Sequence, residues 1–316
     1  MLRYICVQPR ILYYAWQVEV MLNNFIKQGI NPNHIDILVA WNPNDNTSSP
    51  ENIEAWDKLA NYYNTVRFFL YQDTRQQPIK YISSIRPNIL KQHFKIHSEL
   101  ENEVIFYHDC DILFTRKPNF THLLNDNIWY LSNTNSYINY DYIISKGQDV
   151  YDKMCQIIGI NPLIPKLMNS NSGGAQYILK NLDYEFWDKV EEDSERLYYK
   201  ITQLNTNKKV NNSEYHELQI WCADMWAVLW NGWLKGNETK VTPELDFSWA
   251  TDPIEKWNEY LIYHNAGVTC SCNGMFYKGN YINSLPYGIE GKWDQTKNSY
   301  NYLLEIQQTE KKSCLI

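Results

Sequence analysis

The chain has 316 residues and a formal net charge of −7 at pH 7. This length allows one large α/β domain or two small ones with a sizeable core, and the acidic balance argues against broad binding of a nucleic-acid backbone, which needs an excess of Lys and Arg. Charged residues make up 21% and aromatic residues 15% of the chain, a composition that excludes a disordered protein.

The start of the chain and its cysteines bear on its cellular location. The opening MLRYICVQP looks like a strand and lacks the features of a secretory signal. The sequence contains no run of about 18 apolar residues that would predict a membrane span. Seven cysteines without a C-x-x-C pair indicate reduced thiols, and Cys270 and Cys272 are spaced poorly for a zinc site. We therefore expect a cytoplasmic protein.

The first third of the chain alternates strand and helix patterns. Strands are expected at residues 4–7, 35–40, 66–70 and 104–107, and helices at 17–28, through Trp56, and at 86–97. Gly29 is expected to end the first of these helices. Three strand–helix steps in succession predict a mostly parallel sheet of the nucleotide-binding type. Since no repeat or Pro/Gly-rich linker interrupts the sequence, we expect a single compact domain.

The segment EVIFYHDCDILF (103–114) places two carboxylates in a stretch that otherwise looks buried. Polar residues directly after a strand lie at the carboxyl edge of the sheet, where open α/β folds bind ligands. Asp109 and Asp111 are two residues apart, so in an extended chain their side chains converge. Converging carboxylates repel one another unless a cation lies between them, and Mg²⁺ or Mn²⁺ prefers such oxygen ligands. The alternative is a solvated turn that contains two aspartates.

This segment resembles the Asp-x-Asp motif of GT-A glycosyltransferases, which use nucleotide-sugar donors. As in those enzymes, it follows an early strand of a Rossmann-like half, and Pro118 comes shortly after it. SIRPNILKQHF and AWQ are similar to segments of the plant-type hydroxyproline arabinosyltransferase and peptidyl-serine galactosyltransferase group. The resemblance implies a GT-A-like, Rossmann-type mixed sheet flanked by helices over residues 1–293. Within it we expect a nucleotide-sugar-binding half at 1–120, an acceptor half at 121–293, and a peripheral helix and tail at 294–316.

A second carboxylate lies in IWCADMWAVLW, where Asp224 is the one charged residue. Apolar residues at helical spacing predict a helix that is buried nearly all round. We expect Asn212 or Ser213 to cap its start and Gly232 to end it. A carboxylate in such a helix needs a partner or a cleft, because burial of an unpaired charge is costly.

Two readings of Asp224 stay open. It forms a structural salt bridge or hydrogen bond, or it takes part in acid–base chemistry. The resemblance implies the second reading, with Asp224 as general base if the reaction inverts the sugar configuration. In a retaining reaction Asp224 would orient the acceptor or stabilise positive charge at the sugar. The sequence departs from the usual acidic pair of the family, which reads Ala223-Asp224 here, so only one carboxylate is carried over.

The segment YLIYHNAGV reads as an apolar strand that ends at His264. A lone His at a strand end is often a surface residue or a satisfied core residue. Many GT-A enzymes complete their metal site with a His near the C-terminus, so the resemblance implies His264 as the third protein ligand beside Asp109 and Asp111. A neutral imidazole in that role would need a partner that fixes its other nitrogen.

Further donor contacts are expected from three places. Gly173 and Gly174 precede a short strand-like run, where glycines form an ordinary turn or allow close approach of a ligand. The resemblance implies the second role, at the border of donor and acceptor. Gln8 and Pro9, after the first strand, are expected to contact the nucleotide through the backbone. Arg86 is expected to contact phosphate, or it is a surface charge at a helix start.

Together these features predict a metal-dependent glycosyltransferase, a hexosyl- or pentosyltransferase, that uses Mn²⁺ or Mg²⁺ and a nucleotide-sugar donor, which we expect to be a UDP-sugar. The acceptor stays open among a glycan, a protein side chain and a modified DNA base. Aromatic side chains could stack against a sugar ring or could belong to the hydrophobic core; the candidates include Trp230, Trp233, Trp249 and Trp257. Rival functions are a nucleotidyltransferase, although no Gly-rich phosphate loop is visible near the N-terminus, a phosphohydrolase, and a non-catalytic sugar-binding module.

Overall fold

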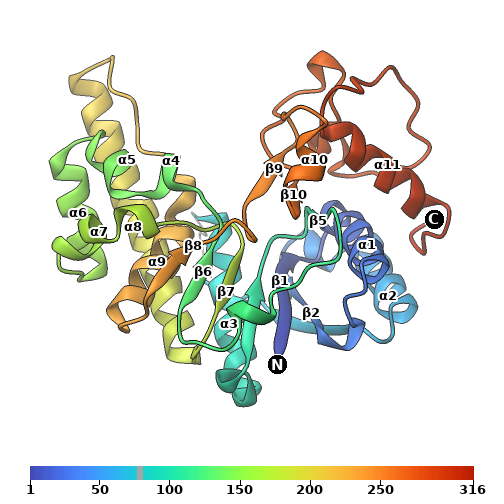
Figure 1. Cartoon of the computed structure of the whole chain (residues 1–316), viewed down its shortest axis with the longest axis horizontal. Coiled ribbons are helices and arrows are strands. Elements are labelled where there is room, and N and C mark those ends of the chain that lie inside the picture. The colour runs from blue at the N-terminus through green and yellow to red at the C-terminus, as the bar shows by residue number, and fades with distance from the viewer. Residues whose placement is uncertain (77–80) are drawn as a thin grey trace. The chain divides into compact units, whose positions relative to one another are not determined.

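The computed structural model describes residues 1–76 and 81–316, without the side chain of Cys272 (Figure 1). The chain divides into two compact units, each assembled from segments that are far apart in the sequence. The first unit comprises Met1–Leu2, Asp73–Tyr107 and Leu123–Thr242, and the second comprises Arg3–Gln72, His108–His122 and Pro243–Ile316.

The second unit contains the first three strands and the first two helices of the predicted strand–helix alternation. Three parallel strands lie in the order β3-β2-β1: β1 (Leu2–Pro9), β2 (Ile35–Trp41) and β3 (Arg67–Gln72). They are connected by α1 (Leu12–Lys27) and α2 (Pro50–Tyr62), which pack against one another. All but the last residue of β2 are buried, as expected for a strand covered on both faces. Gly29 follows α1 in a left-handed conformation, with φ of 83°.

The first helix is longer than predicted. The pattern placed its start at residue 17, whereas α1 begins at Leu12. Tyr13, Tyr14 and Trp16 have only moderate helix propensity, so the sequence signal was weak there. Packing decides the conformation instead: Trp16 is fully buried, and its Nε1 donates a hydrogen bond to the carbonyl of Tyr281 at 3.1 Å.

The second unit also holds a small sheet of order β5-β10-β9. Its strands are β5 (Ile112–Phe114), β9 (Phe247–Trp249) and β10 (Ile262–His264). β10 pairs antiparallel with β5 and parallel with β9. On β5, the amide of Asn24 from α1 bonds both backbone groups of one residue: it accepts from Phe114 N at 2.8 Å and donates to Phe114 O at 3.1 Å. The unit is completed by α10 (Lys256–Glu259), α11 (Ser299–Glu310) and the 3₁₀ turns η1 (Pro32–His34), η2 (Asn46–Ser48), η5 (Thr121–Leu123), η8 (Cys272–Gly274) and η9 (Lys278–Tyr281).

The first unit has four strands in the order β4-β7-β6-β8. They are β4 (Val104–Tyr107), β6 (Trp129–Leu131), β7 (Tyr177–Leu179) and β8 (Thr239–Val241), with β7 antiparallel to both of its neighbours and β6 parallel to β8. Its longer helices are α3 (Ile85–Ile96), α6 (Gln148–Ile158), α8 (Tyr184–Asn211) and α9 (Ala223–Leu234). Its shorter elements are α4 (Asn135–Ile138), α5 (Tyr140–Ile144), α7 (Leu163–Leu167), η3 (Ile82–Ser84), η4 (Ser98–Asn102), η6 (Asn169–Asn171) and η7 (Ile220–Cys222). The mixed α/β class predicted from the sequence is confirmed.

The helix that carries Asp224 has boundaries other than those predicted. Asn212 is the residue that ends α8, not a cap for α9, and α9 begins at Ala223 after the turn η7. Gly232 lies inside α9, where an added Cβ would meet the indole of Trp129 at 2.3 Å. The glycine is therefore required by packing of Trp129 against the helix and does not terminate it.

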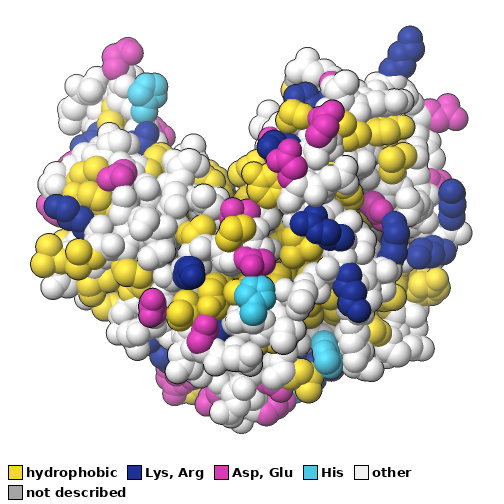
Figure 2. Space-filling model, in the orientation of Figure 1, with side chains coloured by type: hydrophobic (Ala, Val, Ile, Leu, Met, Phe, Trp, Pro, Cys, Tyr) yellow, Lys and Arg dark blue, Asp and Glu magenta, His cyan; other side chains and the backbone are white. Residues whose placement is uncertain are grey.

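Charge is mixed over the surface. On the face drawn in Figure 2, acidic and basic side chains occur among apolar ones, as the net charge of −7 leads one to expect. None of the helices in residues 1–76 and 81–316 combines the length and apolar character needed to cross a membrane. Cys270 is disulfide-bonded, so the expectation of reduced cysteines throughout is wrong for this residue. The free thiols are Cys6, Cys110, Cys155, Cys222 and Cys314.

Candidate functional site

The turn after β4 carries the two aspartates, and the register of the small sheet brings His264 to them. β5 follows the turn directly and pairs with β10 so that Ile112 lies opposite His264. The next residue, Asn265, donates its backbone N–H to the carbonyl of Asp111 at 2.9 Å. This pairing sets the imidazole of His264 beside the carboxylates.

The three predicted ligands converge within the second unit. His264 Nε2 lies 3.3 Å from Asp111 Oδ1 and 3.8 Å from Asp109 Oδ2. One possible ligand atom from each residue lies within 4.8 Å of the other two. Adjacent ligands of an octahedral ion with bonds of about 2.1 Å lie about 3 Å apart. The side chains present therefore fit a divalent ion after a small adjustment, and their role as ligands stays a prediction.

The cluster is enclosed but open on one side. Asp111 is 5% and His264 is 8% exposed, whereas the side chain of Asp109 keeps 27% of its surface in solvent. The imidazole stacks on Trp249, with ring centroids 6.4 Å apart and planes 8° apart, and packs against Phe247. These contacts fix the orientation of the ring, as a precise ligand site requires. Trp249 therefore supports the cluster.

Lys278 is a member of the cluster that the sequence did not indicate. Its Nζ contacts Asp111 Oδ2 from the turn η9. Burial alone would raise the pKa of Asp111, but the positive charge of Lys278 and the contact with His264 lower it below its usual value. Burial would likewise lower the pKa of Lys278, and the charge of Asp111 raises it. Both groups of this pair are therefore charged, and Asp109 adds a second carboxylate to the cluster.

His108 lies beside the aspartates but belongs to the core. Its ring is buried and packs against Phe25 with centroids 5.3 Å apart. Burial lowers the pKa of His108 to about 4, so the imidazole is neutral at pH 7. Its Nδ1 lies 2.9 Å from the carbonyl of Asp109. This contact supports the backbone of the aspartate turn from the interior side.

Asp224 forms a second charged cluster, within the first unit. It is 5% exposed and lies in the first turn of α9. Arg86 Nη2 donates to Asp224 Oδ2 at 2.6 Å, and the Tyr81 hydroxyl donates to Asp224 Oδ1 at 2.6 Å. Burial raises the pKa of Tyr81, and the charge of Asp224 raises it further, so the hydroxyl keeps its proton. The structure brings Arg86 to Asp224, a pairing that the sequence did not suggest, and Tyr81 carried no sequence signal for this role.

Gly173 and Gly174 are surrounded by atoms of the protein itself. A Cβ on Gly173 would lie 2.3 Å from the carbonyl oxygen of Ser132, and one on Gly174 would lie 2.3 Å from the Tyr177 hydroxyl. A Cβ on Gly174 would also meet Met225, the neighbour of Asp224, at 2.9 Å. The absence of side chains at both positions is thus needed for internal packing, and contact with a donor stays a prediction.

Gln8 and Pro9 are the last residues of β1, where they pair with Val39 and Ala40 of β2. The next residue, Arg10, was not singled out by its sequence context. Its guanidinium lies over the ring of Trp41, 5.6 Å from the centroid, and its Nε donates to the carbonyl of Thr47 at 2.6 Å. The carboxyl end of β1 is therefore followed by a guanidinium group, that of Arg10, which is fixed in place beside the aromatic ring of Trp41.

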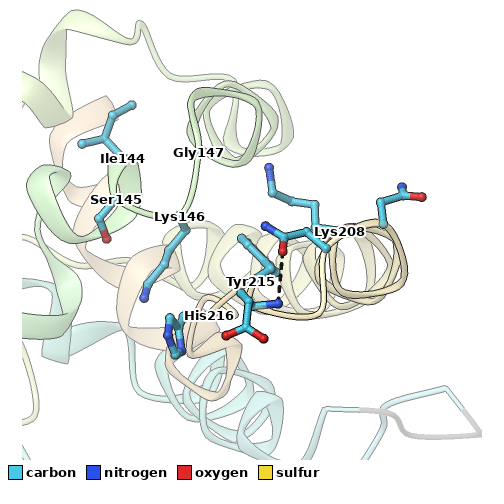
Figure 3. Close-up of a pocket in the computed structure, with 10 residues that line it drawn as sticks. Ile144, Ser145, Lys146, Gly147, Lys208, Tyr215 and His216 are labelled. Atoms are coloured by element: carbon cyan, nitrogen blue, oxygen red, sulfur yellow. Dashed lines mark hydrogen bonds between the residues drawn. The ribbon is translucent and has the colours of Figure 1, made fainter.

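A polar pocket of about 590 Å³ lies at the C-terminal end of α8 (Figure 3). Lys208 is engaged there by Asp149 at 2.7 Å and lies over the ring of Tyr215. Glu214 is the one carboxylate among the lining residues, so the pocket does not offer the ligand set of a divalent ion. The lining residues are Ile144, Ser145, Lys146, Gly147, Lys208, Asn211, Asn212, Glu214, Tyr215 and His216.

Comparison with known proteins gives weak similarities. No family model and no curated protein matches the sequence. Among solved structures, the apo WbbM bifunctional glycosyltransferase is 10% identical, with 98% of this chain and 50% of that chain covered and a TM-score of 0.46, so the present chain spans about half its length. Mouse xyloside xylosyltransferase 1 in its apo form is 10% identical over 86% of this chain and 98% of that chain, with a TM-score of 0.39. Mannosyltransferase PcManGT from Pyrobaculum calidifontis, in complex with GDP-Man and Mn²⁺, is 12% identical over 73% of this chain and 71% of that chain, with a TM-score of 0.29. Similarities at this level do not assign the chain to a family.

Proposed function

We propose that this chain is a divalent-metal-dependent glycosyltransferase that moves a sugar from a nucleoside-diphosphate donor, a UDP-sugar, to an acceptor hydroxyl. The observation that carries the proposal is the convergence of Asp109 and Asp111 with His264, which comes from a distant part of the sequence. The aspartate pair comes early in the chain and the histidine near its C-terminus, which is the order that the resemblance to the Asp-x-Asp motif implies. Hard oxygen ligands with one imidazole suit an ion that also binds phosphate oxygens.

In this proposal Asp109, Asp111 and His264 would hold Mn²⁺ or Mg²⁺, which supplies positive charge for the departing nucleoside diphosphate. The stacked Trp249 keeps His264 in its orientation. Lys278 offsets the charge of Asp111, so the carboxylate pair can stay close together in a partly dry site.

The remaining donor contacts complete the proposal. Gln8 and Pro9 contact the nucleotide through the backbone at the end of β1, and Gly173 and Gly174 border the donor sugar. Arg86 is proposed to contact phosphate through its guanidinium while it keeps its ion pair with Asp224.

Asp224 is proposed to act on the acceptor, as general base in an inverting reaction or as an orienting group in a retaining one. Each of its oxygens already accepts one hydrogen bond, from Arg86 or from Tyr81. A carboxylate oxygen has a second lone pair, so an acceptor hydroxyl can still be bound without displacing either partner. The two fixed contacts hold the carboxylate in one orientation, which helps a group that must meet a hydroxyl within about 3 Å.

Hydrolysis of the donor tests this function without knowledge of the acceptor. Purified protein is incubated with a panel of nucleotide sugars and with Mn²⁺, Mg²⁺ or EDTA, and released nucleoside diphosphate is measured. We expect release from one donor, its loss with EDTA, and its loss in Asp109→Asn. Asp149→Asn removes a carboxylate that pairs with Lys208 in the first unit and serves as the matched control. Silence with every donor, together with no metal-dependent thermal shift by any nucleotide, would exclude the proposed function.

A further inference from the structure

Trp221 is an exposed tryptophan in a chain that buries most of its large aromatic side chains. It leaves 56% of its surface in solvent. Exposure of an indole to water is unfavourable, and an aromatic face near polar groups is a frequent part of a ligand site. By contrast, a set of other tryptophans are less than 2% exposed: Trp16, Trp129, Trp187, Trp226 and Trp230.

The backbone around Trp221 is in contact with side chains from other segments and is not a loose loop. The Tyr81 hydroxyl lies 2.7 Å from the carbonyl oxygen of Trp221. Earlier in the same loop, the amide of Asn205 from α8 bonds both backbone groups of Leu218, at 3.0 Å and 3.3 Å. The backbone that presents the indole is thus fixed by side chains from two other segments, which lowers the entropy cost of binding a ligand there.

A second aromatic ring adjoins the indole, and a polar pair lies near the backbone of Trp221. The ring of Tyr137 lies 5.9 Å from that of Trp221, with planes 31° apart. The Tyr81 hydroxyl lies between the backbone carbonyl of Trp221 and the carboxylate of Asp224, which places the backbone of Trp221 near Asp224. The side chain of Arg86, which pairs with Asp224, keeps 24% of its surface exposed. The same surface therefore offers aromatic faces together with charged hydrogen-bonding groups.

We propose that Trp221 is the stacking platform of a sugar-binding site whose polar groups are Asp224 and Arg86. A sugar ring has an apolar face of C–H groups and an edge of hydroxyls, so it is bound by an aromatic face combined with a few placed polar groups. The Asp224–Arg86 pair offers both a hydrogen-bond acceptor and hydrogen-bond donors, which suits the hydroxyl groups of a sugar. If the chain is the glycosyltransferase proposed above, this sugar is the acceptor, and the acceptor is a glycan. That last identification alone rests on the proposed function.

Saturation-transfer-difference NMR tests the site in the absence of donor and metal. The full chain is mixed in turn with glucose, galactose, mannose, xylose, N-acetylglucosamine, lactose and maltose. We expect transfer to the C–H protons of at least one of these sugars. Trp221→Ala is expected to weaken that binding by roughly threefold to tenfold, as the loss of one aromatic stacking contact predicts. The affinity of Trp221→Phe is expected to lie between those of Trp221→Ala and the unchanged protein.

Tyr199→Ala is the matched control, because Tyr199 is an exposed aromatic residue of α8, 41% exposed. It is expected to bind sugar as the unchanged protein does. Equal binding by Trp221→Ala and by the unchanged protein, or no transfer to any of the sugars, would overturn the proposal. Loss of binding in His216→Ala in place of Trp221→Ala would assign the sugar to the pocket of Figure 3 and would also overturn it.

The two proposals fail in different ways. Donor hydrolysis needs no acceptor, and sugar binding is measured without donor or metal. Donor hydrolysis without sugar binding would leave the glycosyltransferase and remove the platform. Sugar binding that depends on Trp221, without hydrolysis of any donor, would leave a sugar-binding protein. A thermal unfolding curve for each variant shows that it is folded before its binding is compared.

Discussion

Asp111 and Asp224 are both buried carboxylates in contact with a basic side chain, yet their surroundings differ. Asp111 shares its cluster with a second carboxylate, Asp109, and with the imidazole of His264, so the cluster holds two carboxylates and one lysine. Asp224 has Arg86 and the neutral Tyr81, so its charge is matched by a single cation. A cluster with excess negative charge can gain from binding a cation, whereas a balanced pair gains little. Burial and a basic partner therefore do not by themselves distinguish a ligand site from a structural ion pair.

The largest effect is expected from loss of the Asp111 carboxylate. Asp111→Asn should lower metal-dependent donor hydrolysis by about 10²- to 10³-fold, because it removes both a ligand and charge from the site. The rate is measured at saturating Mn²⁺, and metal binding is followed separately by isothermal titration. If Asp111→Asn hydrolyses donor and binds Mn²⁺ as well as the unchanged protein does, the cluster is not the metal site.

The balanced pair should matter most for stability. Arg86→Met leaves the Asp224 charge buried without its cation and should lower the free energy of unfolding by about 2–3 kcal/mol. Urea denaturation measures this change. The double variant Arg86→Met with Asp224→Asn should recover part of it, since the unpaired charge is then gone. Equal losses in the single and double variants would mean that Arg86 acts through packing of its side chain and not through the pair.

Lys278 offers a test of the excess charge in the first cluster. Lys278→Met removes a positive charge that contacts Asp111 and should raise the affinity of the donor-free protein for Mn²⁺ by roughly tenfold, the effect of one nearby charge. Electron paramagnetic resonance of free Mn²⁺ reports the affinity. Lys27→Met, at an exposed ion pair with Glu305, is the control and should leave it unchanged. A lower affinity in Lys278→Met would show that Lys278 organises the carboxylates for the ion.

The smallest expected effect concerns the hydroxyl beside Asp224. Tyr81→Phe removes a donor to the carboxylate and the acceptor for the backbone N–H of Asp224, which lies 3.0 Å from the hydroxyl oxygen. Unfolding free energy should fall by about 1 kcal/mol, the usual cost of a lost hydrogen bond with a buried partner. Tyr198→Phe, whose ring stacks on Tyr81, serves as control. A loss of the same size in both variants would show that the effect does not depend on the bonds of Tyr81 to Asp224.

The sequence predicted the early strands and the group Asp109, Asp111 and His264 because these depend on local patterns. Apolar runs marked the strands, and polar residues at strand ends, with the family resemblance, marked the site. The basic partners of the two buried carboxylates could not be predicted from the sequence. Lys278 contacts Asp111 from a short 3₁₀ turn, and Arg86 contacts Asp224 through the packing of separate helices. No periodicity or spacing connects such residues along the chain.

The boundaries of α9 were predicted wrongly for a different reason. The polar run before Asn212 continues α8, so the cap residues expected for α9 end the preceding helix instead. Gly232 was taken as a stop signal, whereas it leaves room for Trp129 inside the helix. In both cases the local preference was real, but tertiary packing gave the residue a different use.

The bonds of Asn24 to β5 also govern where the aspartates point. β5 is an edge strand, and the Asn24 amide satisfies both backbone groups of Phe114 in the way that a neighbouring strand would. The amide thereby blocks strand addition at that position and ties β5 to α1 at one residue. A slip of β5 by a single residue would turn every side chain to the opposite face. The Asn24 side chain of α1 thus fixes the register of β5, and with it the direction in which the Asp111 carboxylate points.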